Sequence, residues 1–221
     1  MATGQAGAVT SSPDPALRAD ARRNRDQILA AAAHAFTASG IDVPMEEIAR
    51  AAGVGVGTLY RRFADREALV VAVVQHNVET LLGRIRTATA EEPLAFDALV
   101  RSMSFSRELK LLLPTPNLLP PNLMAAIRDD VTVSRLRQEL RELTDSLVAA
   151  AQQEGTLRPD VGAGDVAQLF TLIYRAKPAG SREVTDLAAT RALAVILDGL
   201  RTGPRGPLPG QPLQTSDLER R

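Results

Sequence analysis

The sequence predicts an all-α protein, and three observations support this fold class. Apolar residues recur at spacings of three, four and seven through most of the chain, as in helices with one buried face. Alanine, leucine, arginine and valine dominate, and glycine and proline fall mostly between the periodic stretches. Two short periodic stretches between residues 45 and 63 are joined by a glycine turn. Together these patterns predict about nine helices.

The first of these two stretches has four apolar residues with the spacing of one helix face: Met45, Ile48, Ala49 and Ala52. Gly53 is expected to end this helix, because glycine adopts the left-handed conformation common at helix C-termini. A second helix is expected to begin near Gly55 or Val56, with Val56, Leu59 and Phe63 on its apolar face.

The opposite face of this second helix is polar and basic, with Gly57, Thr58, Arg61 and Arg62. Two helices joined by a glycine turn, the second with a basic outer face, form a helix-turn-helix. In that motif the second helix enters the major groove of DNA.

Composition restricts the classes of protein that fit. The net charge is zero, so any nucleic-acid site must be a local basic patch. The chain has no cysteine, which excludes disulfides and thiolate metal sites and is typical of a reducing cytoplasm. The N-terminus does not have the pattern of a secretory signal, and the longest apolar runs are too short to span a bilayer. We therefore expect a cytoplasmic protein that does not partner with a membrane.

The run from Arg22 to Leu69 resembles the N-terminal domain of the TetR (tetracycline repressor) family of bacterial transcription regulators. The matching motifs are RNRDQILAAAAHAF, then Gly40, EEIARAAGV, GTLYRRF and DREAL, in this order. The other two thirds of the chain has no comparable motif, and the C-terminal halves of the family vary with the ligand. The resemblance implies a homodimeric repressor that binds a palindromic DNA operator and releases it when a small molecule binds.

This reading divides the chain into four parts: a flexible N-terminal arm (1–20), a helix-turn-helix DNA-binding domain (21–66), a helical ligand-binding and dimerisation domain (67–203) and a Pro/Gly-rich tail (204–221), which we expect to be extended or poorly ordered. The expected helices cover about 22–39, 44–52, 56–63, 66–87, 93–113, 121–130, 131–154, 164–176 and 182–201. Asp65 is placed to cap the fourth of these helices.

The residues predicted to contact DNA are Arg22, Arg25, Val56, Gly57, Thr58, Tyr60, Arg61, Arg62 and Arg66. Each arginine at the start of the first helix would interact unfavourably with the positive end of the helix dipole, at a cost of about 0.3–1 kcal/mol. A bound DNA phosphate would offset this cost. The alternative is that these arginines form a basic helix end that is simply solvated.

The resemblance makes Arg66 a phosphate clamp. Val56 stands where many relatives have a polar residue, and it suits contact with a thymine methyl group. Thr58 and Arg61 can bond a base or a phosphate. Tyr60 borders the buried face, so a purely structural role for its ring is an alternative to phosphate contact.

The second domain has no catalytic motif, no phosphate loop and no metal-binding spacing, so we expect no enzyme activity, cofactor or metal. His34 and His76 are the only histidines, and His34 is read as structural. The family implies a small-molecule pocket among the fourth to eighth helices. Candidate lining residues are Leu99, Met103, Phe105, Leu123, Met124, Phe170 and Tyr174. The alternative is that these side chains simply fill the hydrophobic core of the domain. If a pocket exists, its apolar lining favours an apolar or aromatic ligand.

The helix expected at 182–201 is apolar around most of its circumference, which indicates burial on more than one side. Burial within one subunit is the simpler explanation, whereas the family implies a four-helix dimer interface made by the last two helices of each subunit. The predicted interface residues are Leu187, Ala192, Leu193, Ile196, Leu197 and Leu200.

Three other functions remain open. A DNA-binding regulator controlled by a protein partner instead of a ligand would have a dry, fully packed second domain. A protein that shapes DNA without regulating it needs a broad basic surface, which zero net charge argues against. A helical enzyme is disfavoured by the absent motifs.

Overall fold

The structure is a computed structural model that describes residues 15–103, 119–175, 181–203, 206, 208–212 and 214–215, without the side chains of 15–18, 21, 103, 170, 174, 175, 182 and 186. These ranges contain helices and one isolated β-bridge, between Leu157 and Arg201. The helices are α1 Pro15–Ser39, α2 Met45–Ala51, α3 Val56–Arg62, α4 Arg66–Glu91, α5 Ala95–Met103, α6 Pro121–Asp129, α7 Val131–Gln153, α8 Ala163–Arg175 and α9 Arg182–Leu200. The predicted all-α class is confirmed.

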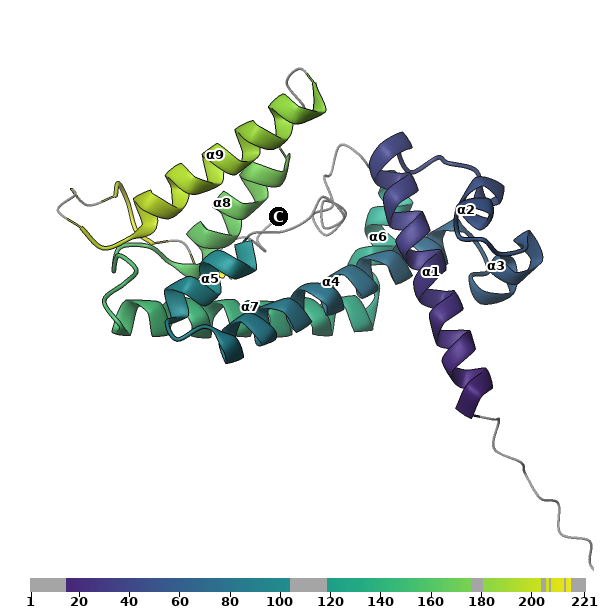
Figure 1. Cartoon of the computed structure of the whole chain (residues 1–221), viewed down its shortest axis with the longest axis horizontal. Helices are drawn as coiled ribbons and strands as arrows, with labels where there is room; N and C mark the ends of the chain where they lie inside the picture. Colours follow the sequence, from purple (N-terminus) through teal and green to yellow (C-terminus); the bar gives the residue numbers. More distant parts are fainter. Residues whose placement is uncertain are drawn as a thin grey trace, which may run out of the picture.

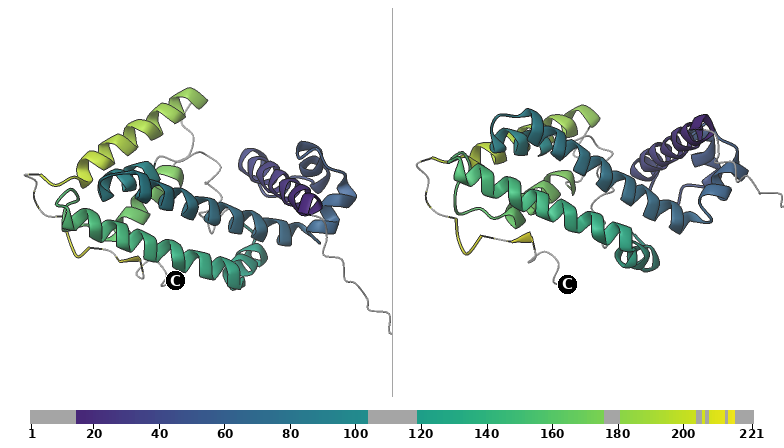
Figure 2. Two further views of the ribbon diagram at one scale, coloured as in Figure 1. Left: turned by 60° about the horizontal axis from the view of Figure 1, so that its bottom comes forward. Right: turned by 90° about the horizontal axis from the view of Figure 1, so that it is seen from below.

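Helix α4 is shared by the two ends of the molecule (Figure 1). Its first half packs against α1 in the three-helix unit, and it also packs against α5, α6 and α7. The views in Figure 2 show α4 and α7 running side by side, with α8 and α9 stacked at the end far from α1–α3. Among the described helices, none combines the length and hydrophobicity needed to span a membrane.

Two polar contacts set the register of α4 against α7. Gln75 Nε2 donates to Asp130 Oδ1 at 3.0 Å, and Arg86 forms an ion pair with Glu139 further along both helices. Asp130 also accepts from the Val133 N–H at 2.7 Å, which caps α7. One carboxylate therefore starts α7 and ties it to α4.

The sequence placed the start of the first helix at about Arg22, but α1 begins at Pro15. Proline suits the first turn of a helix, and the residues that follow it are rich in alanine and arginine, which are strong helix formers. Residues 15–20 were therefore wrongly assigned to the flexible arm. The fourth helix is also longer than predicted, ending at Glu91 rather than about Thr87. The second half of the helix predicted over 93–113 lies outside the described residues.

The described part of segment 201–215, called here the C-terminal strap, is fastened to the loop between α7 and α8. Arg158 donates from Nε and Nη2 to the Asp160 carboxylate at 2.6 and 2.8 Å, and from Nη2 to the Gly206 carbonyl at 3.0 Å. The same carboxylate accepts from the Leu208 N–H at 2.7 Å. The backbone of the strap is thus held at Gly206 and Leu208 by one ion pair.

Contacts at both ends of the strap continue this attachment. The Arg201 guanidinium lies 4.5 Å from the centroid of the Phe96 ring, beside the bridge to Leu157. At the other end, the Thr215 hydroxyl lies 3.2 Å from a carboxylate oxygen of Asp145 on α7. The strap therefore connects the end of α9 to the flank of α7.

Acid should weaken this attachment. The Arg158 hydrogen bonds, and next the Leu208 N–H, hold the pKa of Asp160 well below its ordinary value. A depressed folded-state pKa adds stability that is complete above the unfolded-state pKa, near pH 4, and is lost as pH falls toward the folded-state pKa. We predict that Asp160→Asn lowers the unfolding free energy at pH 7, and that its difference from the unmodified protein shrinks below pH 4. Urea unfolding between pH 7 and pH values below 4 measures this difference in unfolding free energy. The control is Asp129→Asn, because Asp129 forms an exposed ion pair with Arg128. A difference that stays constant with pH would contradict this role of Asp160.

Candidate nucleic-acid interface

The turn between α2 and α3 has the geometry that the sequence predicts. Gly53 has a φ of 67°, in the left-handed region that favours glycine. The N–H groups of Gly53 and Val54 donate to the carbonyls of Arg50 and Ala49 at 3.1 and 3.0 Å. These bonds close the C-terminus of α2 and lead the chain directly into α3.

Helix α3 is anchored by one buried side and presents the other to solvent. Leu59 is fully buried, and Phe63, which follows the helix, is buried as well. The predicted contact residues Gly57, Tyr60, Arg61 and Arg62 are exposed, and Thr58 is half-buried. Tyr60 is 44% exposed, so it is partly covered by the core and partly open to solvent.

Val56 was assigned to the apolar face of α3 as well as to the DNA-reading set. It is 37% exposed, so, unlike Leu59 and Phe63 on the same face, it is not buried. The first residue of a short helix lies at the rim of the packed face, where the core does not reach it. This position leaves Val56 free for contact with a base.

The basic residues of α1 lie within the helix, not at its start. Because α1 begins at Pro15, Arg22 is two turns from the N-terminus, and Arg25 is further in. The dipole acts mainly on the first turn, so the predicted dipole penalty for these arginines does not apply. Arg22 and Arg23 are exposed, Arg25 is half-buried, and Arg23 pairs with Asp20.

Arg66, the first residue of α4, makes contacts within the protein that sequence reasoning did not foresee. Its Nη1 donates to the carbonyls of Ile41 and Val43 at 2.5 and 2.6 Å, and the residue is half-buried. These carbonyls belong to the turn between α1 and α2, so Arg66 joins this turn to α4. The neighbouring Asp65 accepts from the Ala68 N–H at 2.8 Å, which confirms its predicted role as the cap of α4.

Replacing Arg66 should therefore reduce stability as well as any DNA binding. We predict that Arg66→Ala lowers the unfolding free energy by about 1–3 kcal/mol, because two partly buried carbonyls lose a charged donor. Arg61→Ala, at an exposed site on α3, should change stability by less than about 0.5 kcal/mol. Urea denaturation followed by circular dichroism compares the two variants. Equal stabilities would show that the Arg66 contacts contribute nothing to the fold.

The residues predicted to line a ligand pocket are only partly described. Leu99 and Leu123 are buried and Met124 is half-buried. Phe105 and the side chains of Met103, Phe170 and Tyr174 lie outside the described residues. The predicted pocket therefore remains a prediction.

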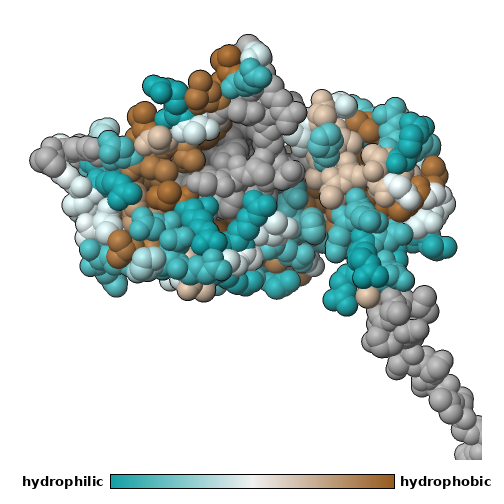
Figure 3. Space-filling model, in the orientation of Figure 1, coloured by the Kyte–Doolittle hydropathy of each residue, from teal (hydrophilic) through white to brown (hydrophobic). Residues whose placement is uncertain are grey.

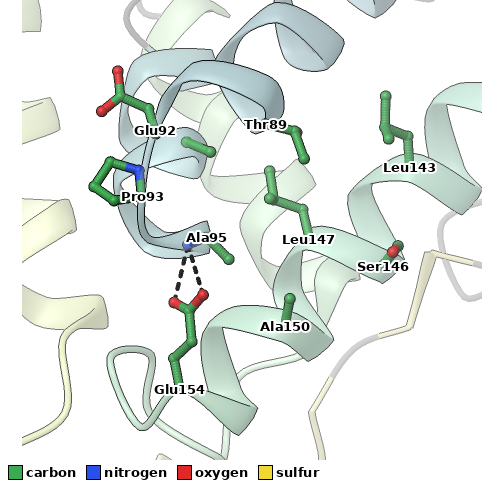
Figure 4. A pocket seen from close by; sticks show the side chains of 10 residues that line it. Thr89, Glu92, Pro93, Ala95, Leu143, Ser146, Leu147, Ala150 and Glu154 are labelled. Carbon is green, nitrogen blue, oxygen red and sulfur yellow. Dashed lines mark hydrogen bonds between the residues drawn. The ribbon is translucent and has the colours of Figure 1, made fainter.

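Among the hollows formed by described residues, two have linings that share no residue with the predicted set. One, of about 250 Å³, lies where α4, α5 and the end of α7 meet (Figure 4). At its edge both carboxylate oxygens of Glu154 accept from the Ala95 N–H, at 2.9 and 3.0 Å, which fastens the start of α5 to the end of α7. The other, of about 380 Å³, lies between α8, α9 and the C-terminal strap.

Some polar side chains in the described part of the second domain are shielded from water. Asn77 on α4 and Ser102 on α5 are buried, and Asn77 Nδ2 and Ser102 Oγ form no hydrogen bond. Arg137 on α7 is half-buried, and burial, with the positive charge of Arg141 as a second cause, lowers its pKa. Within the described residues, no group of His, Cys, Asp and Glu side chains is placed to hold a metal ion.

The predicted dimer surface on α9 separates into two sides. Leu187 and Ala192 are exposed, whereas Leu193, Ile196 and Leu197 pack in part against their own subunit. Leu200 is only 4% exposed, so its assignment to the interface is wrong: the end of α9 is covered by its own subunit. Sequence reasoning missed the exposed Leu172 and Val184. The spacing of Val184 from Leu187, one turn away, was an available signal.

Comparisons with known proteins agree with this geometry. The family model "Bacterial regulatory proteins, tetR family" matches residues 28–73, and the model "Transcriptional regulator SbtR-like, C-terminal domain" matches residues 99–202. An HTH-type transcriptional regulator of Staphylococcus aureus (strain USA300) is 27% identical over 96 residues, which are 43% of this chain and 52% of that protein. The match thus spans about half the length of this curated relative.

Solved structures match over more of the chain. A TetR transcription regulatory protein from Mycobacterium vanbaalenii is 34% identical, with a TM-score of 0.61, over 84% of this chain and 99% of that one. A TetR transcriptional regulator from Streptomyces coelicolor is 31% identical, also with a TM-score of 0.61, over 81% and 99% of the two chains. The helix-turn-helix geometry and these matches together show that this chain belongs to the TetR family of bacterial transcriptional regulators.

Proposed function

We propose that this DNA-binding transcriptional regulator is a cytoplasmic, homodimeric repressor that binds a palindromic operator and leaves it when a small molecule binds. The observation that carries the proposal is the outer face of α3, where Gly57, Tyr60, Arg61 and Arg62 are exposed on a helix whose other side is anchored by Leu59. An anchored helix with an exposed polar face suits insertion into the major groove.

Two kinds of contact follow from the chemistry of this face. Arg61, Arg62 and Arg22 are exposed cations with the reach and charge to bind phosphate, which positions the protein without reading sequence. Val56 and Thr58 lie in the first turn of α3, the part of a recognition helix that meets base edges. Val56 suits a thymine methyl group, and the Thr58 hydroxyl suits a base or a phosphate. For Arg66, phosphate contact is left to Nε and Nη2, since Nη1 is engaged within the protein.

Operator binding distinguishes the two kinds of contact. We predict that Arg61→Ala weakens binding to all DNA sequences alike. It should also lower by about one the magnitude of the slope of the log binding constant against log salt concentration. Val56→Ala or Thr58→Ala should instead change base preference, by about 1–3 kcal/mol at the affected base pair. Selection of bound sequences from random DNA, followed by titrations at several salt concentrations, measures both effects.

A matched control uses Arg135, an exposed arginine on α7 in the other domain. Arg135→Ala should leave affinity, salt slope and base preference unchanged. If Arg61→Ala behaved like this control, α3 would not be the DNA-reading helix.

A dimer is required because one helix-turn-helix reads too few base pairs, whereas two related by a two-fold axis read a palindrome. The structure supports a surface for it: Leu172 on α8 and Val184, Leu187 and Val195 on α9 are all more than half exposed. Large apolar side chains that share a surface without cover favour a partner. A native mass of one subunit at micromolar concentration would rule out the dimer.

The ligand is proposed to bind among α4–α8, and the unpaired groups suggest its chemistry. Arg137 lies on the same stripe of α7 as the buried Val148, at a spacing of eleven residues, so it faces the inside of the domain. A desolvated cation without a carboxylate partner is costly, and a negative group on a ligand would offset that cost. We therefore propose a mainly apolar ligand with one anionic group, rather than a purely apolar one.

Decanoate and 1-decanol test this proposal, because they share a chain and differ in charge. We predict that decanoate raises the melting temperature and weakens operator binding more than 1-decanol does, and that Arg137→Gln removes the difference. A hundredfold weakening of operator binding corresponds to a coupling free energy of about 2.7 kcal/mol between the ligand and the operator. Arg135→Gln is the control.

If neither compound changes operator affinity, the alternative regulator, controlled by a protein partner, becomes the better explanation. If the two compounds have equal effects on the unmodified protein, the proposed anionic group of the ligand is contradicted, while the proposal of a ligand-controlled repressor stands.

A further inference from the structure

Two polar side chains are enclosed in the interior of the second domain. Asn77 on α4 and Ser102 on α5 are each only 5% exposed, and within the described residues Asn77 Nδ2 and Ser102 Oγ have no hydrogen-bond partner. Val74 and Leu81, one turn to either side of Asn77, are buried apolar residues. In Figure 3 hydrophilic residues cover much of the lower surface of this domain, over α4 and α7, where polar side chains reach water. Asn77 and Ser102 are exceptions to this division.

Asn77 is the more informative of the two residues. A serine hydroxyl in a helix can rotate toward the carbonyl four residues earlier, so Ser102 can find a partner in its own helix. The amide nitrogen of Asn77 carries two donors, and a buried donor without an acceptor destabilises the fold. Leucine has a similar shape and would avoid this loss of stability. A polar side chain kept where an apolar one would be more stable is typical of a functional site.

The position of Asn77 relative to Arg137 follows from the register of α4 and α7. In the two polar contacts between these helices, the residue nearer the start of α4 meets the residue nearer the start of α7, so the helices run in the same direction. Counted from either contact, Arg137 lies roughly 8–10 Å beyond Asn77 along the common axis. Side chains lean toward the start of their own helix. Because both helices run the same way, the two polar ends stay at different levels of the domain.

Ser102 lies closer to the level of Arg137 than to that of Asn77. Helix α5 follows α4 after a short loop and packs against it, so it runs back along α4. Ala98, one turn before Ser102, lines the hollow of about 250 Å³ together with Thr89 of α4. Counted from Thr89, Ser102 is within about one turn of the level of Arg137. Asn77 is about two turns away from Ser102 on the same scale.

We propose that the ligand of this domain carries, besides the anionic group assigned to Arg137, an uncharged oxygen that accepts a hydrogen bond from Asn77 Nδ2. Ser102 donates to the anionic group beside Arg137. Between these levels α4 presents the buried apolar residues Val78 and Leu81, so the intervening part of the ligand is apolar. The ligand class is thus a carboxylic acid with a ketone or ester oxygen several carbons along its chain. This inference rests on the ligand-controlled repressor proposed above.

Decanoate and 7-oxodecanoate test the acceptor oxygen, because they share a chain length and a charge. Isothermal titration calorimetry on the full chain measures both dissociation constants. We expect 7-oxodecanoate to bind about three- to tenfold more tightly, which is the effect of one hydrogen bond. Asn77→Leu should abolish this preference, because leucine has no donor, and should leave decanoate binding with its original affinity or more tightly.

Thermal unfolding of the ligand-free variants separates ligand recognition from a structural role. Asn77→Leu should unfold at the same temperature as the unmodified protein or a higher one, because it removes a buried donor that has no acceptor. Asn77→Ala removes the amide without adding volume, and it should lose the preference for 7-oxodecanoate as well. Ser102→Ala should weaken both acids by the same factor, since both carry the carboxylate. Asn122→Leu, at an exposed site on α6, is the control and should change neither binding nor preference.

The outcomes distinguish this inference from the proposed function on which it rests. A preference for 7-oxodecanoate that both Asn77 variants lose, without a lower melting temperature of Asn77→Leu, supports it. If the unmodified protein binds both acids equally, or if both variants keep the preference, contact between Asn77 and the ligand is overturned, while a repressor controlled by an anionic ligand stands. If neither acid binds, the proposed ligand site itself fails, and this inference fails with it.

Discussion

Two hydrogen bonds from Arg66 join the start of α4 to the turn before α2, so this helix links the two ends of the molecule. A residue at the start of α4 holds the carbonyls of Ile41 and Val43, while the rest of α4 packs against α5, α6 and α7. A change in the tilt of α4 is therefore passed to the turn between α1 and α2. A flexible link at this point would let the helix-turn-helix keep its position whatever happened in the other domain.

Helices α7 and α9 are attached to the rest of the domain in different ways. Asp130 and Glu139 tie α7 to α4 at two points, so these helices are expected to move together. Helix α9 is held instead at its C-terminal end, by the bridge between Leu157 and Arg201 and by the strap. A two-fold dimer through α9 would fix the distance between the two copies of α3, and movement of α4 against α9 is then a direct way to change that distance.

Sequence reasoning succeeded where local patterns decide the structure. Gly53 has the predicted positive φ, Asp65 caps α4, and α6 to α9 begin and end within a residue or two of the predicted positions. It failed where contacts between distant segments decide. The carbonyl of the buried Leu200 accepts from the distant Arg158 N–H, and the partners of Arg66 lie more than twenty residues away. Periodicity identifies an apolar residue but does not tell whether its own subunit or another molecule covers it.

The arginines show how the structure divides one residue type between stability and function. Arg66, Arg86 and Arg158 have partners within the chain, and sequence alone did not separate them from the rest. Arg61 and Arg62 lie exposed on α3, and Arg137 is half-buried and forms no ion pair with the residues that the structure describes. An exposed cation costs little when its partner is absent, whereas a desolvated one costs more. The exposed arginines therefore suit DNA, which binds and leaves a surface, and Arg137 suits a partner that enters the domain. Burial is the first cause of the lowered pKa of Arg137, and the proposed anionic group of a ligand would offset this desolvation.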